Sequence, residues 1–370
     1  MDMNTSSSQE IPLRTSALLM QHKPVGHNPG EAYFISLDDR NTPSPIRPYN
    51  SQQIRILQSC NGLLLCSNNS SEGNCCVYNL STNHIATVPK HPLGYGPLGY
   101  RRLGFGSDNN YFGLIYDPLK SLHYKIIAFV IRSGSSSVDD LHIYSSETGT
   151  WKAVVQSFIR APKKIFPDGV YCNGCIHWLS IYDCFYFNAD KEKLETFPRP
   201  PIAARSGGRT LYFGESQNHL HVVDILLFSL NVYEMKSDYS EWFIKYQIDL
   251  DSISKVFPEM TDGKNYYAVA VLSLIRREKF EEDSFLEESF LVLEIPGKAI
   301  RCNLVDRSLK LIWDFGVTFN LKKIEYWTWI PGRYFGVYSI SLQRLVDCGW
   351  DRFFDVFGQV LEGNDVKKAR

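Results

Sequence analysis

The feature that most constrains this chain is an internal repeat with a unit of about 40–50 residues. An aromatic or small apolar residue, a polar turn of about five residues and an apolar return segment recur along the sequence. The copies begin at Phe34, Tyr78, Tyr144, Phe187, Tyr233 and Cys302. Neighbouring copies are 44, 66, 43, 46 and 69 residues apart, and the two long spacings indicate insertions. Units of this length are typical of β-propellers, in which each unit is a four-stranded blade.

A second motif recurs near the front of the unit. Asn61-Gly62 and Asn173-Gly174 each lie between two apolar segments, and Gln217-Asn218 is a weaker copy. Asn and Gly adopt the positive φ that a two-residue hairpin turn requires, so each pair predicts the turn between strands one and two of a blade. The complete unit is clearest over residues 111–155, where we expect strands at 113–117, 124–131, 141–145 and 151–155.

These patterns predict an all-β fold: a single, kelch-like β-propeller of about six four-stranded blades, with seven as the alternative count. We expect an irregular N-terminal segment over residues 1–30, the propeller over 31–345 and a C-terminal tail over 346–370. The strand at 32–37 is expected to join a strand within 327–342 in the last blade. Pairing of strands from the two ends would close the ring and remove free sheet edges.

Composition excludes several classes of partner. The formal net charge is −1, so no long-range field favours nucleic acid or an anionic membrane. The first ten residues are polar, and no apolar run reaches the ~20 residues of a membrane helix. Nine cysteines are scattered through the chain, which is typical of free thiols in a reducing compartment. We therefore expect the cytoplasm, the nucleus or both.

No motif predicts catalysis, a metal or a cofactor. Cys172-x-x-Cys175 with His177 resembles a metal or redox site, but Cys172 occupies the same hairpin position as Cys60, which indicates a packed thiol. The glycine-rich stretch 94–106 lacks the Gly-Lys-Ser/Thr of a phosphate loop and is interpreted as an inter-blade loop. The carboxylates over 278–288 are expected to form a solvated loop. His177, His219 and His221 are expected to be ordinary packing or surface residues. A propeller enzyme would instead need carboxylates or histidines that converge on the central channel.

Several long stretches, among them Ile56-Leu-Gln-Ser-Cys-Asn-Gly-Leu-Leu-Leu-Cys66, make the chain resemble the plant F-box-associated domain. The other stretches are 143–151, 212–216, 232–243 and 290–298. The resemblance implies a propeller that captures a protein substrate, while an F-box before it binds the Skp-type adaptor of a cullin ubiquitin ligase. Only about thirty residues precede the first expected strand, and they contain no Trp, so an intact F-box is not expected within this sequence. Adaptor and cullin would then bind only through an upstream F-box. The alternative is a protein-interaction scaffold or decoy that does not recruit a ligase.

The expected partner-binding residues lie on the irregular links between blades. These links are at about 89–110, 156–169, 198–210, 252–264 and 316–331, and irregular loops on a rigid scaffold are the usual place for recognition. They are rich in aromatic and basic residues, the types that dominate interface energetics. The candidates are Tyr95, Tyr100, Arg101, Arg102, Arg160, Lys163, Lys164, Arg205, Arg209 and Trp327. Arg101 and Arg102, beside Tyr95 and Tyr100, are expected to pair with carboxylates or phosphates of a partner.

Overall fold

The fold is an all-β propeller, seen in a computed structural model of the chain. The structure describes residues 15–22, 32–36, 44–46, 54–68, 75–79, 82, 84–90, 111–130, 140–154, 169–179, 184–201, 209–261, 267–281, 284–314 and 335–341. In this part of the chain 24 strands are accompanied by one short α-helix and one 3-10 helix. None of the described helices is long and apolar enough to cross a membrane.

Five four-stranded antiparallel sheets each consist of four consecutive strands, which is the arrangement of a propeller blade. The first two are β4 (Ile54–Cys60), β5 (Leu63–Asn68), β6 (Cys75–Asn79), β7 (His84–Val88), and β8 (Tyr111–Ile115), β9 (Lys125–Val130), β10 (Asp140–Ser145), β11 (Thr150–Val154). The third is β12 (Val170–Cys172), β13 (Cys175–Trp178), β14 (Cys184–Asn188), β15 (Lys193–Phe197). The last two are β16 (Arg209–Ser216), β17 (His219–Leu226), β18 (Ser229–Met235), β19 (Trp242–Asp249), and β20 (Ala270–Glu281), β21 (Ser284–Ile295), β22 (Lys298–Asn303), β23 (Leu309–Asp314).

A further four-stranded sheet combines strands from the two ends of the described chain, in the order β24-β1-β2-β3. Its strands are β1 (Thr15–His22), β2 (Ala32–Ser36), β3 (Ser44–Ile46) and β24 (Phe335–Ser341). The sequence predicts about six blades, whereas five are built from consecutive strands. The expected direct pairing of 32–37 with the last strand is also wrong, because β1 lies between β2 and β24. β1 lies in the segment that was expected to be irregular. A strand is not predicted there because no turn signal accompanies the short apolar run Ala17–Met20.

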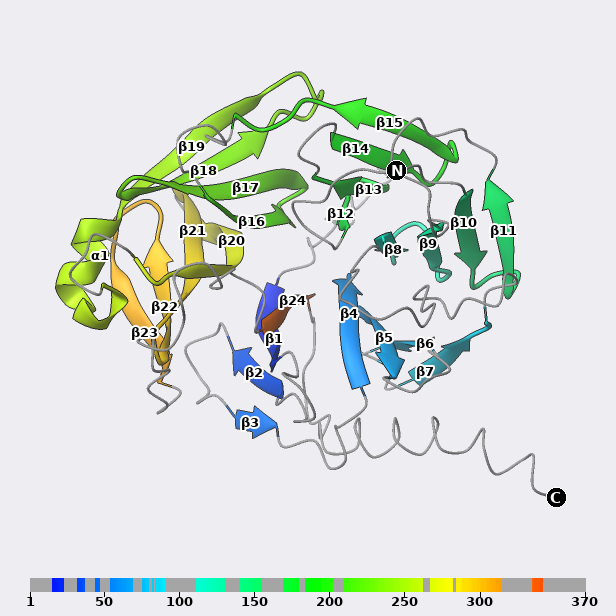
Figure 1. Ribbon diagram of the computed structural model, residues 1–370, viewed down its shortest axis with the longest axis horizontal. Coiled ribbons are helices and arrows are strands. Elements are labelled where there is room, and N and C mark those ends of the chain that lie inside the picture. The colour runs from blue at the N-terminus through cyan, green and yellow to red at the C-terminus, as the bar shows by residue number, and fades with distance from the viewer. Residues whose placement is uncertain are drawn as a thin grey trace, which may run out of the picture.

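The sheets stand around a common centre (Figure 1). The innermost strands of neighbouring sheets contact one another in the order β4, β8, β12, β16, β20, β24 and β4 again. The apolar cores lie between neighbouring sheets; one of them contains Leu65 and Val77 of the β4–β7 blade and Leu114 and Ile126 of the β8–β11 blade. Central strands are therefore covered on both faces, and β13 is buried at all four residues. Hence their sequences read as apolar runs without strict alternation.

The hairpin turns confirm the prediction from Asn-Gly. Asn61 and Gly62 have φ of 44° and 87°, and Asn173 and Gly174 have φ of 51° and 78°. Gln217 and Asn218 follow with φ of 54° and 58°. The blade predicted over 111–155 is confirmed as β8–β11, with each strand within two residues of its expected position.

Two regions differ from their expected structure. The link at 252–264 overlaps α1 (Leu250–Val256) and contains the 3-10 helix η2 (Pro258–Met260). Asp249 caps α1, since its Oδ1 accepts a 3.2 Å hydrogen bond from the Asp251 N–H. The carboxylate-rich stretch 278–288 is not a loop. It belongs to the long β20–β21 hairpin, which is paired as far as Glu281 and Ser284; near the end of this ladder Phe280 lies opposite Phe285, and aromatic pairs across strands stabilise a sheet.

Candidate functional site

The topology gives the propeller two faces. The turns between strands one and two and between strands three and four lie on one face, which we call the turn face. The described turns between strands two and three, and the described part of the link after β19, lie on the other face, the link face. Of the link face, the structure describes most at the last two consecutive-strand blades, β16–β19 and β20–β23.

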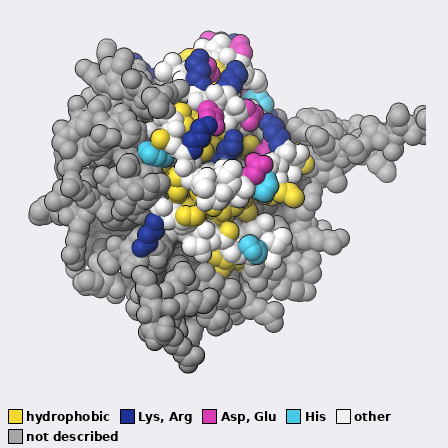
Figure 2. All heavy atoms as spheres, turned by 90° about the vertical axis from the view of Figure 1, so that its right-hand side faces the viewer, with side chains coloured by type: hydrophobic (Ala, Val, Ile, Leu, Met, Phe, Trp, Pro, Cys, Tyr) yellow, Lys and Arg dark blue, Asp and Glu magenta, His cyan; other side chains and the backbone are white. Residues whose placement is uncertain are grey.

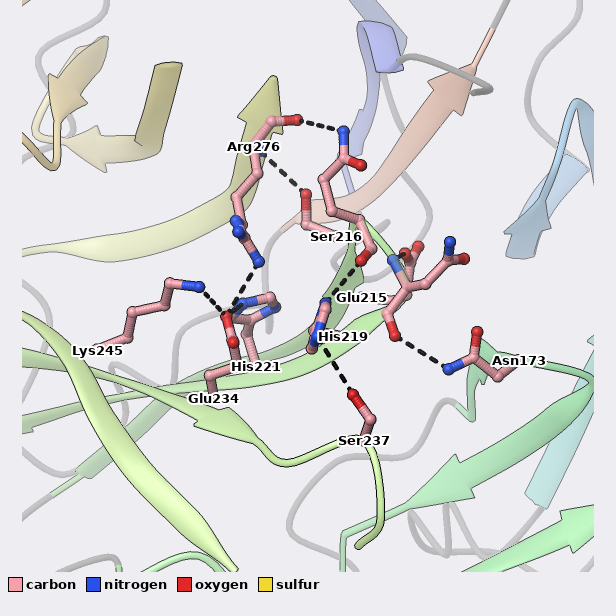
Figure 3. Close-up of polar contacts among 11 residues, drawn as sticks. Asn173, Glu215, Ser216, His219, His221, Glu234, Ser237, Lys245 and Arg276 are labelled. Atoms are coloured by element: carbon pink, nitrogen blue, oxygen red, sulfur yellow. Dashed lines mark hydrogen bonds and ion pairs between the residues drawn. The ribbon is translucent and has the colours of Figure 1, made fainter. Parts of the chain in front are cut away.

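On the turn face, neighbouring hairpins are joined by hydrogen bonds (Figure 3). The Asn173 side chain donates to the carbonyl of Asn218, 3.0 Å away in the next blade. The Gln217 side chain donates to the carbonyl of Arg276 at 3.4 Å, and the Arg276 N–H donates to Ser216 Oγ at 3.0 Å. Asn61 makes the same kind of bond to the carbonyl of Tyr116 at 2.7 Å. The described turns thus fix one another, and their polar groups are largely occupied within the protein.

A buried ionic cluster joins the β16–β19 blade to the β20–β23 blade. Glu234 Oε2 accepts from His221 Nε2 at 2.9 Å, Lys245 Nζ at 2.6 Å and Arg276 NH1 at 3.1 Å (Figure 3). Burial by itself raises the pKa of Glu234, but the bonds from His221 and Lys245 outweigh it and lower that pKa to about 2. The cluster is internal and its carboxylate is occupied, so it acts as a structural link between blades.

The described link face exposes apolar side chains beside α1. Leu227 and Phe228, which form the turn between β17 and β18, are 77% and 42% exposed, and Val256 at the end of α1 is 58% exposed. The N–H of Leu250 donates to the carbonyl of Phe228 at 2.8 Å, so the turn and α1 lie side by side. Phe228 also meets the Tyr267 ring edge-on, with 6.2 Å between ring centroids. We call Leu227, Phe228 and Val256 the link-face apolar group.

Leu227 is the one aliphatic residue among the described non-glycine residues with positive φ, the others being Asn61, Asn173, Glu192, Gln217, Asn218, Tyr239 and Arg307. Its φ is 55°, a left-handed conformation that costs most non-glycine residues about 1–2 kcal/mol. Asn, Gly and Gln occupy the turns at 61–62, 173–174 and 217–218. A large apolar residue that is both strained and exposed does not stabilise the fold. Leu227 is therefore a candidate functional residue.

The rim of the disc carries mixed charge. On the side of the molecule that lies to the right in Figure 1, basic and acidic side chains are interspersed with apolar ones (Figure 2). Lys152 and Glu192, for example, pair at 2.6 Å between neighbouring blades. Among the side chains that the structure describes on this rim, neither sign of charge dominates, so they do not favour a polyanion.

The three histidines that the sequence analysis considered pack within the fold. His177 and His221 are fully buried, which confirms their packing role, and His219 is half-buried. Burial lowers the pKa of His177 to about 3, so this ring is neutral between Tyr186 and Tyr239. His177 Nε2 is 2.7 Å from the hydroxyl of Tyr239.

Cys172 and Cys175 face each other across the β12–β13 hairpin, and both are buried. Burial raises the pKa of both thiols, that of Cys175 to about 11. The packed-thiol interpretation is confirmed. Within the described ranges, His, Cys, Asp and Glu form no group of three that could hold a metal ion.

Most of the predicted partner-binding residues lie outside the described residues. These are Tyr95, Tyr100, Arg101, Arg102, Arg160, Lys163, Lys164, Arg205 and Trp327. Arg209 is described as the first residue of β16, opposite Ile225. Sequence reasoning missed the link-face apolar group, although Leu227-Phe228 at a turn position, where Gly or Asn is usual, is a readable signal.

Comparison with known proteins places the chain in a family. Residues 25–224 match the family described as F-box associated beta propeller domain. F-box protein At5g07610 of Arabidopsis thaliana is 30% identical over 334 residues, which are 80% of this chain and 74% of that protein. F-box protein At5g49610 of Arabidopsis thaliana is 26% identical over 279 residues, which are 68% of this chain and 75% of that protein.

Among solved structures, the β-propeller domain of the trilobed protease from Pyrococcus furiosus covers 82% of this chain and 80% of its own, with 9% identity and a TM-score of 0.38. A likeness at that level supports no conclusion about this chain. The kelch-like assignment is not part of the matched family's description. The match over more than half of the chain and the related plant proteins show that this chain belongs to the F-box associated β-propeller domain family.

Proposed function

We propose that this chain recognises a protein substrate for an SCF-type cullin ubiquitin ligase and itself performs no catalysis. Family membership supports the role, since the two related plant proteins are F-box proteins. In this proposal, an F-box in the full gene product binds the Skp-type adaptor and, through it, the cullin. The cytoplasm or nucleus, where such ligases act, is the proposed compartment.

The observation that carries the proposed site is the exposed, strained Leu227. A rigid scaffold that holds apolar side chains in water at no gain to its own stability is typical of a protein-binding surface. Phe228 and Val256 extend the surface, and the hydrogen bond from Leu250 to Phe228 fixes the turn against α1. We propose that the substrate contacts the link face here.

Leu227→Asn separates folding from binding. Asn tolerates the positive φ, so the variant should be as stable as the wild type or up to about 1 kcal/mol more stable. Proteins captured by the tagged wild type in plant cells with the proteasome inhibited are compared with those captured by this variant. A substrate should be captured at least tenfold less by Leu227→Asn, while Val305→Ser, an exposed apolar site on the turn face, should leave capture unchanged.

The second measurement tests the ligase role. Overexpression of the full gene product should lower the level of the captured protein in a proteasome-dependent way. If the level rises instead, the chain is a scaffold or decoy without ligase recruitment. If Leu227→Asn is stable and captures every protein equally well, the link-face apolar group is not the substrate site.

A further inference from the structure

The first hairpin of the β20–β23 blade is longer than the strand that covers it. β20 and β21 have 12 residues each, whereas β22 has six and pairs only with residues 290–295 of β21. Among the described strands, the rest of the hairpin, in which 277–281 pair with 284–288, is therefore two-stranded. We call it the β20–β21 arm. A two-stranded ribbon is marginally stable by itself, and a third strand stabilises it.

The base of the arm is fixed to the rest of the propeller. Arg276 NH1 lies 3.1 Å from Glu234 Oε2 of the preceding blade. Glu288 forms an ion pair with Arg301 of β22, whose guanidinium group lies 3.9 Å from the centroid of the Phe290 ring. The arm thus starts from a rigid base, and the cations Arg276 and Arg301 have their carboxylate partners there.

Hydrogen bonds at this base determine the direction of the backbone groups. The carbonyl of Ser289 accepts from the N–H of Leu304, 2.7 Å away, just after β22. Arg276 lies opposite Ser289, and its N–H points to the preceding blade, where it donates to Ser216 Oγ at 3.0 Å. Arg276 and Ser289 are therefore a non-hydrogen-bonded pair of the antiparallel ladder.

The alternation of the ladder leaves one edge of the arm open. The ladder has no register shift within the arm, so Phe285 and Glu287 direct their N–H and C=O groups to the same side as Ser289. β22 ends at Asn303, and no described strand lies beside residues 284–287 on that side. An edge of this kind can accept a further strand, whose backbone hydrogen bonds supply affinity.

The arm has a large excess of negative charge. Over residues 277–288 the sequence has six carboxylates and two basic residues, a net charge of −4 in a chain whose formal net charge is −1. Arg301, the partner of Glu288, reduces this excess by only one charge. The carboxylates are those of Glu278, Glu281, Glu282, Asp283, Glu287 and Glu288, and the basic residues are Arg277 and Lys279.

Two of these acidic residues lie directly opposite each other. Glu278 is paired with Glu287, next to the pair of Phe280 and Phe285. Both pairs have the same non-hydrogen-bonded position as the pair at the base, at which residues on the two strands come closest. Like charges directly opposite each other destabilise a sheet, so Glu278 and Glu287 do not stabilise the arm. A positive charge supplied by a partner would offset their repulsion.

We propose that the open edge of the β20–β21 arm binds a basic, extended segment of a partner protein. The segment adds as a strand beside residues 284–287 and continues the line of β22, and its lysine or arginine residues offset the charge of Glu278 and Glu287. A second copy of this chain is disfavoured as the occupant, because two arms with the same excess of negative charge repel each other. The arm lies on the turn face, so this site does not depend on the proposed substrate site.

The test uses random 12-residue peptides displayed on phage. The full chain is the target, and Glu278→Gln/Glu287→Gln is used for counter-selection. Enriched peptides should have a net positive charge and, as synthetic peptides in fluorescence anisotropy, should bind the double variant about tenfold more weakly. The matched control is Asp238→Asn/Glu241→Gln, which removes two exposed carboxylates from another turn of the same face and should bind as the wild type does.

Backbone N-methylation of the peptides separates strand addition from general electrostatic attraction. A strand that pairs along one edge directs every second N–H to the arm. Methylation of alternate residues in one register should therefore weaken binding about tenfold, and methylation in the other register should have little effect. The double variant loses a repulsive pair, so its melting temperature should equal or exceed that of the wild type, which separates lost binding from lost folding.

Several outcomes would overturn the proposal. They are the enrichment of no peptide, the enrichment of acidic or neutral peptides, and equal binding to the wild type and Glu278→Gln/Glu287→Gln. Equal effects of the two methylation registers would exclude strand addition and overturn it as well. Leu227→Asn should bind the peptides as the wild type does; a loss of binding in this variant alone would assign the peptides to the link face and overturn the proposal.

Discussion

At the scale of single residues, the polar groups inside this propeller are paired with particular partners. The Glu234 carboxylate accepts hydrogen bonds from three side chains, and one of these, Arg276, belongs to the next blade. His221 donates from Nε2, because a carboxylate only accepts, and so its ring is the tautomer with the proton on that nitrogen. Burial lowers the pKa of His221, which keeps the ring neutral.

Glu234→Gln should destabilise the protein by about 3 kcal/mol, because Lys245 and Arg276 lose the charge that compensates their burial. Urea denaturation followed by tryptophan fluorescence measures the change. The control is Glu241→Gln, which breaks the exposed pair with Lys236 and should change stability by less than about 0.5 kcal/mol. Equal effects in both variants would show that the buried cluster contributes no more than a surface pair.

The same cluster predicts a dependence on pH. The pKa of Glu234 is about 2 in the folded protein, below its usual 4.5, so its contribution to stability is present above pH 4.5 and is lost as pH falls toward 2. Stability of the wild type should therefore fall more steeply than that of Glu234→Gln over this window. Parallel curves from pH 5 to pH 3 would contradict the assignment.

The thiols should be inert in the folded state. All eight cysteines that the structure describes are free and buried, and burial raises the pKa of Cys60, Cys75 and Cys172 well above the usual value. At pH 8, Ellman's reagent should modify at most one of the nine cysteines within minutes, and all nine in urea. Rapid modification of two or more thiols in the native protein would contradict this packing.

At the scale of elements, two-residue turns set the register of the hairpins that they close, among them β4–β5, β12–β13 and β16–β17. Gly174 has a φ of 78°, and a Cβ built there would make only ordinary van der Waals contact, the nearest atom being Lys120 Nζ at 3.5 Å. Glycine is therefore favoured at this position by the positive φ of the backbone and not by a lack of space for a side chain.

Gly174→Ala should lower the free energy of unfolding by about 1–2 kcal/mol. Gly174→Asn should lower it by less, because Asn tolerates positive φ. Thermal or urea unfolding of the two variants checks the difference. An equal loss for Ala and Asn would point to packing around the turn and not to backbone conformation.

Indole side chains on outer strands join blades in a second recurring way. Trp151 Nε1 donates to the carbonyl of Pro89 at 2.9 Å, and Trp242 Nε1 donates to the carbonyl of Pro198 at 2.8 Å. In each case the tryptophan on the fourth strand reaches the residue that follows the fourth strand of the preceding blade. The repeated aromatic signal in the sequence therefore also encodes contacts between units.

At the scale of the whole molecule, strands from the two ends of the described chain share a sheet. β24 pairs with β1 from Thr15↔Ser341 to His22↔Phe335 and contacts both β4 and β20. Leu18 of β1 is fully buried in the core shared with the β20–β23 blade.

Deletion of residues 335–370 should lower the free energy of unfolding by roughly 5 kcal/mol, since the ladder loses several hydrogen bonds of about 1 kcal/mol each. Urea denaturation should show an earlier midpoint, and hydrogen exchange should become faster in β1. An unchanged midpoint and unchanged protection of β1 would mean that the rest of the molecule folds without this pairing.

The sequence by itself determined the repeat unit, the positions of the Asn-Gly turns and the strands over 111–155, because strand alternation and positive φ are local properties of the chain. The burial of Cys172, Cys175 and His177 could also be predicted, since these residues occupy repeat positions whose neighbours are apolar. Only the tertiary structure decided that β1 lies between β2 and β24, because strand pairing between distant segments leaves no local signal. It also decided that Leu227, Leu119 and Leu122 face water while similar residues form the core, since exposure depends on which neighbouring blade covers each side chain.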